Sequence, residues 1–316
     1  MAYLPAPVAA TRRAVRSALA WLPAGSLVLV ACSGGADSLA LAAATSFVAP
    51  RMGLRAGLVT IDHGLQAGSA ARAEAVVGWA AGFSPVLSMA VEVSGAGGPE
   101  AAARNARYAA LEAAALEYAA AAVLLGHTRD DQAETVLLAL ARGAGPRGMS
   151  GMPVRRGLLL RPFLGVARSE TRKACAALGL EIWDDPHNRD SAYARARVRA
   201  DLLPALIAAL GPGVVDNLAR TAGQLAADNA ALDALAAAEV RDELVVTDLS
   251  VLPDAIRTRV LHQWARRLGV PGGSLSHRHV AALDALITDW HGQGSTALPG
   301  GVQVARREGR LTRVDL

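Results

Sequence analysis

The sequence predicts a doubly wound α/β fold with a mostly parallel sheet, followed by a smaller, mainly helical C-terminal domain. Over about the first 140 residues, short runs rich in apolar and β-branched residues alternate with Ala/Leu-rich helical stretches. This pattern is typical of βαβ units, which build a parallel sheet covered by helices on both faces. The alternation then stops, and long helical stretches dominate the remainder.

In the first part, each expected strand is a short apolar run that ends at a Gly-containing or polar segment. An amphipathic helix is expected before the first strand. Strands are expected over residues 26–31, 54–61, 85–93 and 121–125, with helices from the first turn to about 48 and over 69–82, 100–118 and 128–140.

In the second part, the glycine-rich and basic stretch 142–152 is expected to be a loop. Helices are expected over residues 169–178, 211–239, 254–268 and 276–290, and a hairpin over 303–314. The boundary is expected between residues 203 and 211. The predicted domains are therefore a nucleotide-binding catalytic domain over 1–205 and a helical linker with a small substrate-binding domain over 206–316.

Composition excludes several classes of protein. The 316 residues are 52% hydrophobic and 19% charged, which is typical of a globular chain long enough for two domains. The two cysteines, Cys32 and Cys175, form no CxxC pair, so neither a disulfide framework nor a zinc or iron–sulfur site is expected. No signal peptide and no membrane span is expected, which predicts a cytoplasmic protein. The net charge of +4 permits a polyanionic partner.

A candidate phosphate-binding loop follows the first strand. Its glycines let backbone N–H groups turn inward, and the next helix adds the partial positive charge of its N-terminus. Two serine hydroxyls are further donors, and Asp37 is suited to hold Mg²⁺ against phosphates. The loop lacks the Walker A lysine and is not GxGxxG; the alternative is a plain Gly/Ser turn. The loop consists of Ser33, Gly34, Gly35, Ala36, Asp37 and Ser38.

Further motifs follow at the ends of other expected strands or nearby in the chain. Those at strand ends lie where open α/β sheets bind ligands. The motifs are DHGL (62–65), RNARY (104–108), GHTRDDQAET (126–135), RGAG (142–145), RPFL (161–164), DPHN (185–188) and YARARVR (193–199).

Together with SGGADS, these motifs resemble the tRNA(Ile)-lysidine synthetase family of PP-loop, Rossmann-like ATP pyrophosphatases, most closely over residues 25–205. The resemblance implies that ATP, with Mg²⁺, adenylates the 2-carbonyl oxygen of the wobble cytidine in a CAU-anticodon isoleucine tRNA. The amine of free L-lysine then displaces AMP. The product, lysidine, reads AUA instead of AUG. The resemblance also allows a homodimer.

Three side chains of the fourth strand end are candidate catalytic groups. Asp131 and Glu134 are three apart, so they share a helix face beside His127. Such carboxylates suit Mg²⁺ binding, orientation of the lysine ammonium or proton abstraction; for Asp131, helix capping by way of Thr128 is the alternative or an additional role. His127 suits donation to a phosphate or to the adenylated oxygen, and a structural histidine is its alternative.

Two arginines three apart, Arg104 and Arg107, are expected to face the same cleft, where Arg107 offsets charge on the transferring α-phosphate. The alternative is a solvated helix face. Asp62 and His63 are expected to border the nucleoside, through the backbone more than through side chains, and Gly126 is expected to contribute to the nucleotide-binding site.

Nucleic-acid contacts are expected from basic residues near the domain boundary and in the glycine-rich stretch. Phosphate contacts of this kind position an RNA and make its binding salt-dependent, without reading bases. Surface charge without a role is the alternative. The candidates are Arg104, Arg142, Arg147, Arg195, Arg197 and Arg199.

The chain departs from the family pattern at two positions, His187 in place of Ser and Ala196 in place of Asn, and its C-terminal region is short. The first rival function is a PP-loop tRNA thiolase, which the missing CxxC pair disfavours. Another is a small-molecule amide synthetase. A third, a non-catalytic tRNA-binding module, is disfavoured by the intact Asp37, Asp131 and Glu134.

Overall fold

The computed structural model describes residues 4–62, 68–91, 99–184 and 192–314. Its contacts divide the chain into two compact units, Met1–Gln224 and Leu225–Leu316. The division falls inside the long helix α10 (Val214–Glu239). It therefore lies further along the chain than the boundary expected near residues 203–211.

The first unit is built on a six-stranded sheet in the order β3-β2-β1-β4-β6-β5. All neighbouring strands are parallel except β5 and β6, which form an antiparallel edge hairpin. The strands are β1 (Leu27–Ala31), β2 (Arg55–Asp62), β3 (Val86–Ala90), β4 (Ala122–Leu124), β5 (Arg155–Arg156) and β6 (Leu159–Leu160).

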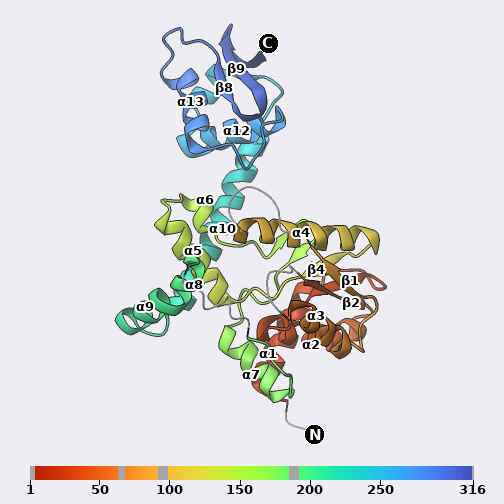
Figure 1. Cartoon of the computed structure of the whole chain (residues 1–316). Coiled ribbons are helices and arrows are strands. Elements are labelled where there is room, and N and C mark those ends of the chain that lie inside the picture. The colour runs from red at the N-terminus through yellow and green to blue at the C-terminus, as the bar shows by residue number, and fades with distance from the viewer. Residues whose placement is uncertain (1–3, 63–67, 92–98, 185–191, 315–316) are drawn as a thin grey trace. The chain divides into compact units, whose positions relative to one another are not determined.

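Helices cover both faces of this sheet, because successive strand residues point to opposite sides. Val28 and Val30 lie in the core shared with α1, α2 and α7, whereas Leu27 and Leu29 lie in the core shared with α4. Figure 1 shows the first three helices on one side of the strands and α4 on the other. The helices around the sheet are α1 (Ala6–Leu19), α2 (Ala36–Arg51), α3 (Ser69–Trp79), α4 (Pro99–Glu117) and α7 (Arg168–Ala177).

Strand order reverses between β1 and β4, because the chain runs outward from β1 through β2 to β3 and then returns to pair β4 with the other side of β1. In open α/β sheets, the crevice beyond the carboxyl ends of two such strands is where ligands bind. The segments that follow β1 and β4 are the phosphate loop and the GHTRDDQAET motif.

The first unit continues past residue 205 because a small core joins its later helices to α5. Val215 and Leu218 of α10 pack with Ala133 of α5, Val198 and Leu203. The elements concerned are α5 (Arg129–Ala141), α6 (Pro146–Met149), α8 (Ala194–Arg197), the π-helical turn η2 (Val198–Leu202) and α9 (Leu203–Leu210). The stretch 142–152, expected to be a loop, thus contains the short helix α6.

The second unit combines helices with a four-stranded antiparallel sheet in the order β7-β10-β9-β8. Trp264 and Leu283, both fully buried, lie at the centre of its core. The expected C-terminal hairpin is confirmed as β9 and β10. The elements after α10 are β7 (Leu244–Val245), α11 (Val246–Ser250), α12 (Asp254–Arg267), α13 (His277–Thr288), β8 (Thr296–Leu298), η3 (Pro299–Gly301), β9 (Val302–Arg307) and β10 (Arg310–Val314).

Among the residues that the structure describes, no single helix is long and apolar enough to cross a bilayer. One bent pair of helices, over residues 194–210 and 214–239, has the required length and composition only when the two are taken together.

Candidate active site

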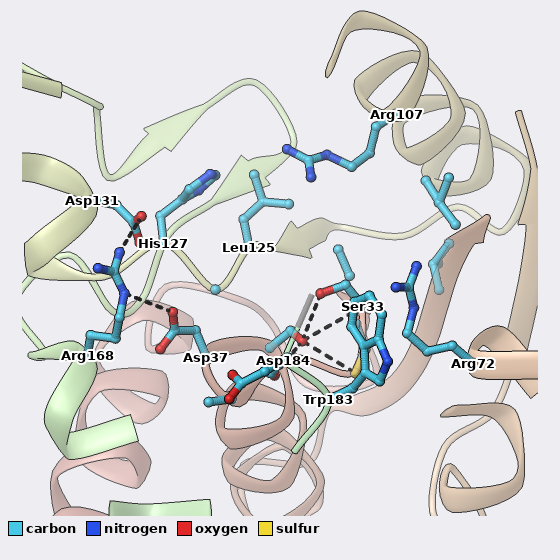
Figure 2. Close-up of a pocket in the computed structure, with 18 of the residues that line it drawn as sticks. Ser33, Asp37, Arg72, Arg107, Leu125, His127, Asp131, Arg168, Trp183 and Asp184 are labelled. Atoms are coloured by element: carbon cyan, nitrogen blue, oxygen red, sulfur yellow. Dashed lines mark hydrogen bonds and ion pairs between the residues drawn. The ribbon is translucent and has the colours of Figure 1, made fainter. Parts of the chain in front are cut away.

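A cavity of about 460 Å³ opens beyond the carboxyl ends of β1 and β4. Its floor combines apolar strand and helix side chains with the polar loop after β1, and charged side chains of α5, α7 and η2 form part of its wall (Figure 2). The apolar part is lined by Ala31, Val59, Ile61, Leu111 and Leu125, and the polar part includes Ser33, Gly35, Ala36, Asp37, Ser38, Gly126, His127 and Asp131.

The phosphate loop has the geometry of an anion-binding turn. Gly34 has a φ of +82°, a left-handed conformation that residues with a Cβ rarely adopt. The Ser38 hydroxyl ties the turn together: it accepts from the Ser33 amide over 3.2 Å and donates to the Gly35 carbonyl over 2.9 Å. Gly35 caps α2 in an extended conformation without a side-chain hydrogen bond. The first N–H groups of α2 are therefore left without a side-chain cap, as an anion site requires.

The ends of β1 and β4 meet at Gly126. A Cβ at this position would lie 3.1 Å from the backbone C and O of Asp37 and the N of Ser38. Only the missing side chain lets the β4 end approach the phosphate loop this closely. Gly126 was predicted to border the nucleotide, and the structure brings it against the loop.

Asp37, in the first turn of α2, faces the cavity. Its Oδ1 accepts a short hydrogen bond from the Thr171 hydroxyl, and its Oδ2 lies 3.6 Å from Nε of Arg168. Burial, together with the charge of Asp131, outweighs Thr171 and the arginines, and raises the pKa of Asp37 to about 6. The arginines therefore stabilise the charge of Asp37 too weakly to offset its burial.

Asp131 is bound from both sides. Oδ2 accepts from the amide and the hydroxyl of Thr128, each over 2.8 Å, and completes the capping box that the sequence predicted. Oδ1 accepts from Arg168 over 2.8 Å and from Arg199 over 3.2 Å. Burial raises the pKa of Asp131, but these arginines and the Thr128 amide outweigh burial and lower it to about 2.

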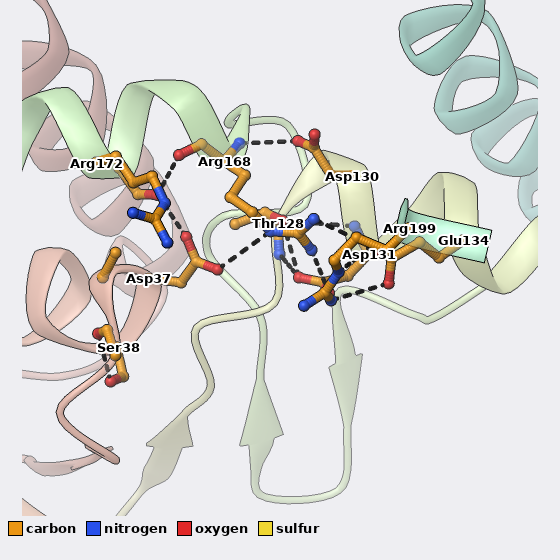
Figure 3. A network of polar contacts seen from close by, with 12 residues as sticks. Asp37, Ser38, Thr128, Asp130, Asp131, Glu134, Arg168, Arg172 and Arg199 are labelled. Atoms are coloured by element: carbon orange, nitrogen blue, oxygen red, sulfur yellow. Dashed lines mark hydrogen bonds and ion pairs between the residues drawn. The ribbon is translucent and has the colours of Figure 1, made fainter. Parts of the chain in front are cut away.

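Glu134 is fully buried and lies among three guanidinium groups (Figure 3). Arg168 donates to Oε1 over 3.1 Å. Arg199 donates to both oxygens, over 2.8 and 3.1 Å, and Nε of Arg195 lies 3.2 Å from Oε2. Asp131 and Glu134 therefore share one face of α5, and their carboxylate oxygens accept hydrogen bonds from arginines.

His127 and Arg107 lie on another side of the cavity. Figure 2 shows Arg107 reaching from α4 toward His127, away from Ser33 and Asp37. Burial and the charges of Arg161 and Arg107 lower the pKa of His127 to about 3, despite Asp131. The ring is neutral at pH 7, and its buried Nδ1 has no hydrogen-bond partner among the residues that the structure describes. Burial, Arg104 and Arg195 lower the pKa of Arg107, even though Tyr108 acts in the opposite direction.

The arginines predicted to contact nucleic acid fall into two groups. Arg195 and Arg199 are four apart and turn toward α5, where Arg195 also donates to the Thr135 hydroxyl over 2.8 Å. Arg197, between them, is exposed and donates to the Ala192 carbonyl. The remaining candidates are Arg104, half-buried on α4, and Arg142 and Arg147, exposed around α6.

Of the two residues predicted to border the nucleoside, the structure describes Asp62 but not His63. Asp62 is the last residue of β2, which pairs with β1. His63, like the departure His187, lies outside the described residues. The other departure, Ala196, is buried in α8 between Arg195 and Arg197.

Sequence reasoning did not single out several cavity residues. Arg168 is the first residue of α7, where a positive charge is unfavourable because it opposes the helix dipole. An arginine at a helix N-terminus could therefore have indicated a carboxylate partner elsewhere in the chain. Thr171, three residues later on the same helix, is not among the lining residues and contributes by donating its hydroxyl to Asp37. Trp183 lies beside the phosphate loop, donating its amide to the Gly34 carbonyl, and Arg72 stacks on its ring at 3.9 Å. No local pattern marks these two, because the tertiary fold alone brings them together.

Comparisons with known proteins agree with this geometry. A family model described as a PP-loop domain matches residues 11–206, and one described as the TilS substrate binding domain matches residues 244–312. The tRNA(Ile)-lysidine synthase of Salinispora arenicola is 66% identical, over 100% of this chain and 98% of that protein. The chain belongs to the tRNA(Ile)-lysidine synthase family. The synthase of Thermobifida fusca is 56% identical, over 97% of both chains.

Among solved structures, a U34-tRNA thiolase from Methanococcus maripaludis, determined with its [4Fe-4S] cluster, aligns with a TM-score of 0.57 and 17% identity. The alignment covers 69% of this chain and 79% of the thiolase. It shows a shared fold alone. As a member of the lysidine synthase family, the chain is an ATP-using ligase that modifies tRNA(Ile), as the motifs predicted.

Proposed function

We propose that the cavity binds ATP and the wobble cytidine of tRNA(Ile) together and joins free L-lysine to the base in two steps. The observation that supports this is the contact of Gly126 with Asp37 and Ser38. It brings the phosphate loop and the His127–Glu134 segment into one cavity. We infer that the two motifs act on the same triphosphate, the loop on its β- and γ-phosphates and His127 on its α-phosphate.

ATP fits this cavity with its adenine over the apolar part and its phosphates on the loop. The side chains of Ala31, Val59 and Ile61 offer the flat apolar surface that a purine needs. The amides at the start of α2 and the Ser33 hydroxyl face the β- and γ-phosphates, while the Ser38 hydroxyl, which donates to Gly35, holds the turn in shape. Cleavage between the α- and β-phosphates then releases diphosphate from the loop.

The first step is adenylation of the base. The 2-carbonyl oxygen of the cytidine attacks the α-phosphorus, and the bond to the β-phosphate oxygen breaks. Arg107 stabilises the negative charge that develops on the α-phosphate oxygens. His127, being neutral, acts as a hydrogen-bond donor or acceptor at the same group and not as a cation.

The second step transfers lysine. Its amine attacks C2 of the adenylated cytidine, the bond to the AMP oxygen breaks, and the amine loses a proton. Asp131 and Glu134 were predicted to orient the ammonium or take this proton. Since arginines occupy both carboxylates, that role requires Arg168 or Arg199 to release an oxygen. We infer that the pair holds these arginines in place before lysine binds.

Asp37 fits as the Mg²⁺ ligand. Mg²⁺ bound to a nucleotide usually takes one or two protein carboxylates together with phosphate oxygens. Asp37 faces the cavity, and among the described residues Thr171 is its one close hydrogen-bond donor, whereas both oxygens of Asp131 are occupied. Among the described residues, no group of three or more His, Cys, Asp or Glu forms a metal site by itself. Bound here, the ion would neutralise charge on the phosphates.

The proposal is tested by incubating the protein with ATP, Mg²⁺, labelled lysine and a CAU-anticodon tRNA(Ile) transcript. We expect label in the tRNA and an equal amount of AMP. A methionine tRNA transcript serves as the control and is expected to stay unlabelled. AMP release without label would indicate a different acceptor, and tRNA binding without AMP would indicate a non-catalytic module.

A further inference from the structure

Four arginines surround Tyr108. One of them, Arg107, lines the cavity. The other three, Arg104, Arg156 and Arg161, form with Tyr108 what we call the Tyr108 cluster. Arg104 donates to the Tyr108 hydroxyl over 3.1 Å, and the guanidinium carbons of Arg104 and Arg156 lie 5.1 and 5.7 Å from the centre of its ring. Burial raises the pKa of this hydroxyl, but Arg104, Arg161 and Arg107 outweigh burial and lower it. The third member, Arg161, thus lies close to the same hydroxyl.

The cluster has positive charge without a matching negative charge. Across residues 4–62, 68–91, 99–184 and 192–314, none of its arginines forms an ion pair with a carboxylate. Arg161 is only 3% exposed, and its buried Nε has no hydrogen-bond partner. The nearby Nδ1 of His127 is also buried and without a partner. Buried donors normally have partners, so Nε of Arg161, which is always a donor, points to an anionic ligand that approaches it; Nδ1 of the neutral His127 ring can instead be an acceptor.

We propose that the Tyr108 cluster binds a backbone phosphate of the RNA next to the base that is modified. This assignment depends on the proposed function, because it assumes an RNA base in the cavity. The planar guanidinium fork matches two phosphate oxygens, and several arginines are a common way to hold one phosphodiester. Tyr108 positions Arg104 and does not itself stack on a base, since it is only 8% exposed.

The position of the cluster favours RNA over ATP as the source of the phosphate. Arg107, which is assigned to the α-phosphate of ATP, lines the cavity, whereas Tyr108 and the three arginines of the cluster are not among the described residues that line it. Exposure increases outward through the cluster, from buried Arg161 to half-buried Arg104 and exposed Arg156 on the edge hairpin. A nucleotide enclosed in the cavity has no need of Arg156, whereas a strand that enters from solvent passes it.

The first test replaces the outer arginines. We expect Arg156→Ala and Arg104→Gln each to raise KM for tRNA about tenfold, the effect of losing one charge-assisted hydrogen bond, with KM for ATP unchanged. Tyr108→Phe, which removes only the hydroxyl that holds Arg104, should raise KM for tRNA less and leave kcat unchanged. The matched control is Arg155→Ala: this equally exposed neighbour stacks on Trp21 and should leave both constants unchanged.

The second test neutralises single phosphates. Full-length tRNA(Ile) carrying one methylphosphonate at a time around the wobble cytidine should show one position at which KM rises about tenfold. In Arg156→Ala, the same methylphosphonate should raise KM for tRNA little further, because the contact between this arginine and the phosphate is already lost. A flat series, additive effects, or a rise in KM for ATP alone would overturn the assignment. Failure of wild-type protein to form lysidine on unmodified tRNA would contradict the proposed function instead.

Discussion

Arg168 donates from Nη2 to Oδ1 of Asp131 over 2.8 Å, across 37 residues of sequence. The same guanidinium donates to Glu134 and lies 3.6 Å from Asp37. One side chain at the start of α7 therefore joins the carboxylate of the phosphate loop to the two carboxylates of α5. This contact holds the two halves of the site together before any substrate binds.

We expect Arg168→Lys to lower both stability and activity. A lysine keeps the charge but cannot donate to two carboxylates at once, which leaves buried oxygens without a partner. Unfolding in urea should show a loss of about 2 kcal/mol, in the range for hydrogen bonds to charged groups. Arg172→Lys is the control on the same helix: its pair with Asp184 is about half exposed, so stability should hardly change. Equal losses in both variants would contradict the assigned role of Arg168.

Asp37→Asn should abolish chemistry without releasing the RNA. Asparagine keeps the size of the side chain but removes the negative charge that suits Mg²⁺. AMP and diphosphate release should fall at least about 100-fold, as for loss of one electrostatic group in an active site. Binding of tRNA, measured by filter retention, should be unchanged. Parallel loss of both would show that Asp37 is structural.

The same substitution should raise stability at neutral pH. The folded-state pKa of Asp37 is about 6, above the ordinary 3.8 of an aspartate, so ionisation favours the unfolded chain. Below pH 3.8 this penalty is absent; it grows as the pH rises and is complete above about 6. At pH 7 it amounts to about 3 kcal/mol, an upper figure for a partly solvated group. Asp37→Asn should therefore gain stability relative to wild type between pH 4 and pH 7 in urea titrations.

The activity should not follow the titration of His127. Its pKa of about 3 keeps the ring neutral at neutral and mildly acidic pH, so His127 itself is expected to contribute no step to the pH profile. His127→Gln should lower kcat about 100-fold, the typical cost of one donor at a developing charge. A step near pH 6 in kcat/KM, arising from Asp37 in the free enzyme, should survive in this variant. Disappearance of that step would assign it to His127.

Much of the site was accessible from sequence because its motifs are short and contiguous. The phosphate loop, His127 and the Thr128–Asp131 cap each follow a strand, so the parallel sheet alone brings them together. Arg195 and Arg199 were predicted to contact RNA as part of a run of positive charge; that they turn toward α5 and Glu134 emerged only from the structure. Arg168, Trp183 and Arg72 could not be predicted this way, because their partners lie far away in the chain.

The last prediction concerns the approach of β4 to the phosphate loop. In Gly126→Ala, the new Cβ lies 3.1 Å from backbone atoms of Asp37 and Ser38, which cannot rotate away as a side chain would. The loop must shift, so ATP binding measured by equilibrium dialysis should weaken, while tRNA binding should be unaffected. Gly78→Ala is the matched control, because an added Cβ there meets nothing within 4 Å on the exposed face of α3. It should retain ATP affinity and gain up to about 1 kcal/mol of stability from better helix propensity. Wild-type ATP affinity in Gly126→Ala would mean that the close contact of the two motifs does not shape the nucleotide site.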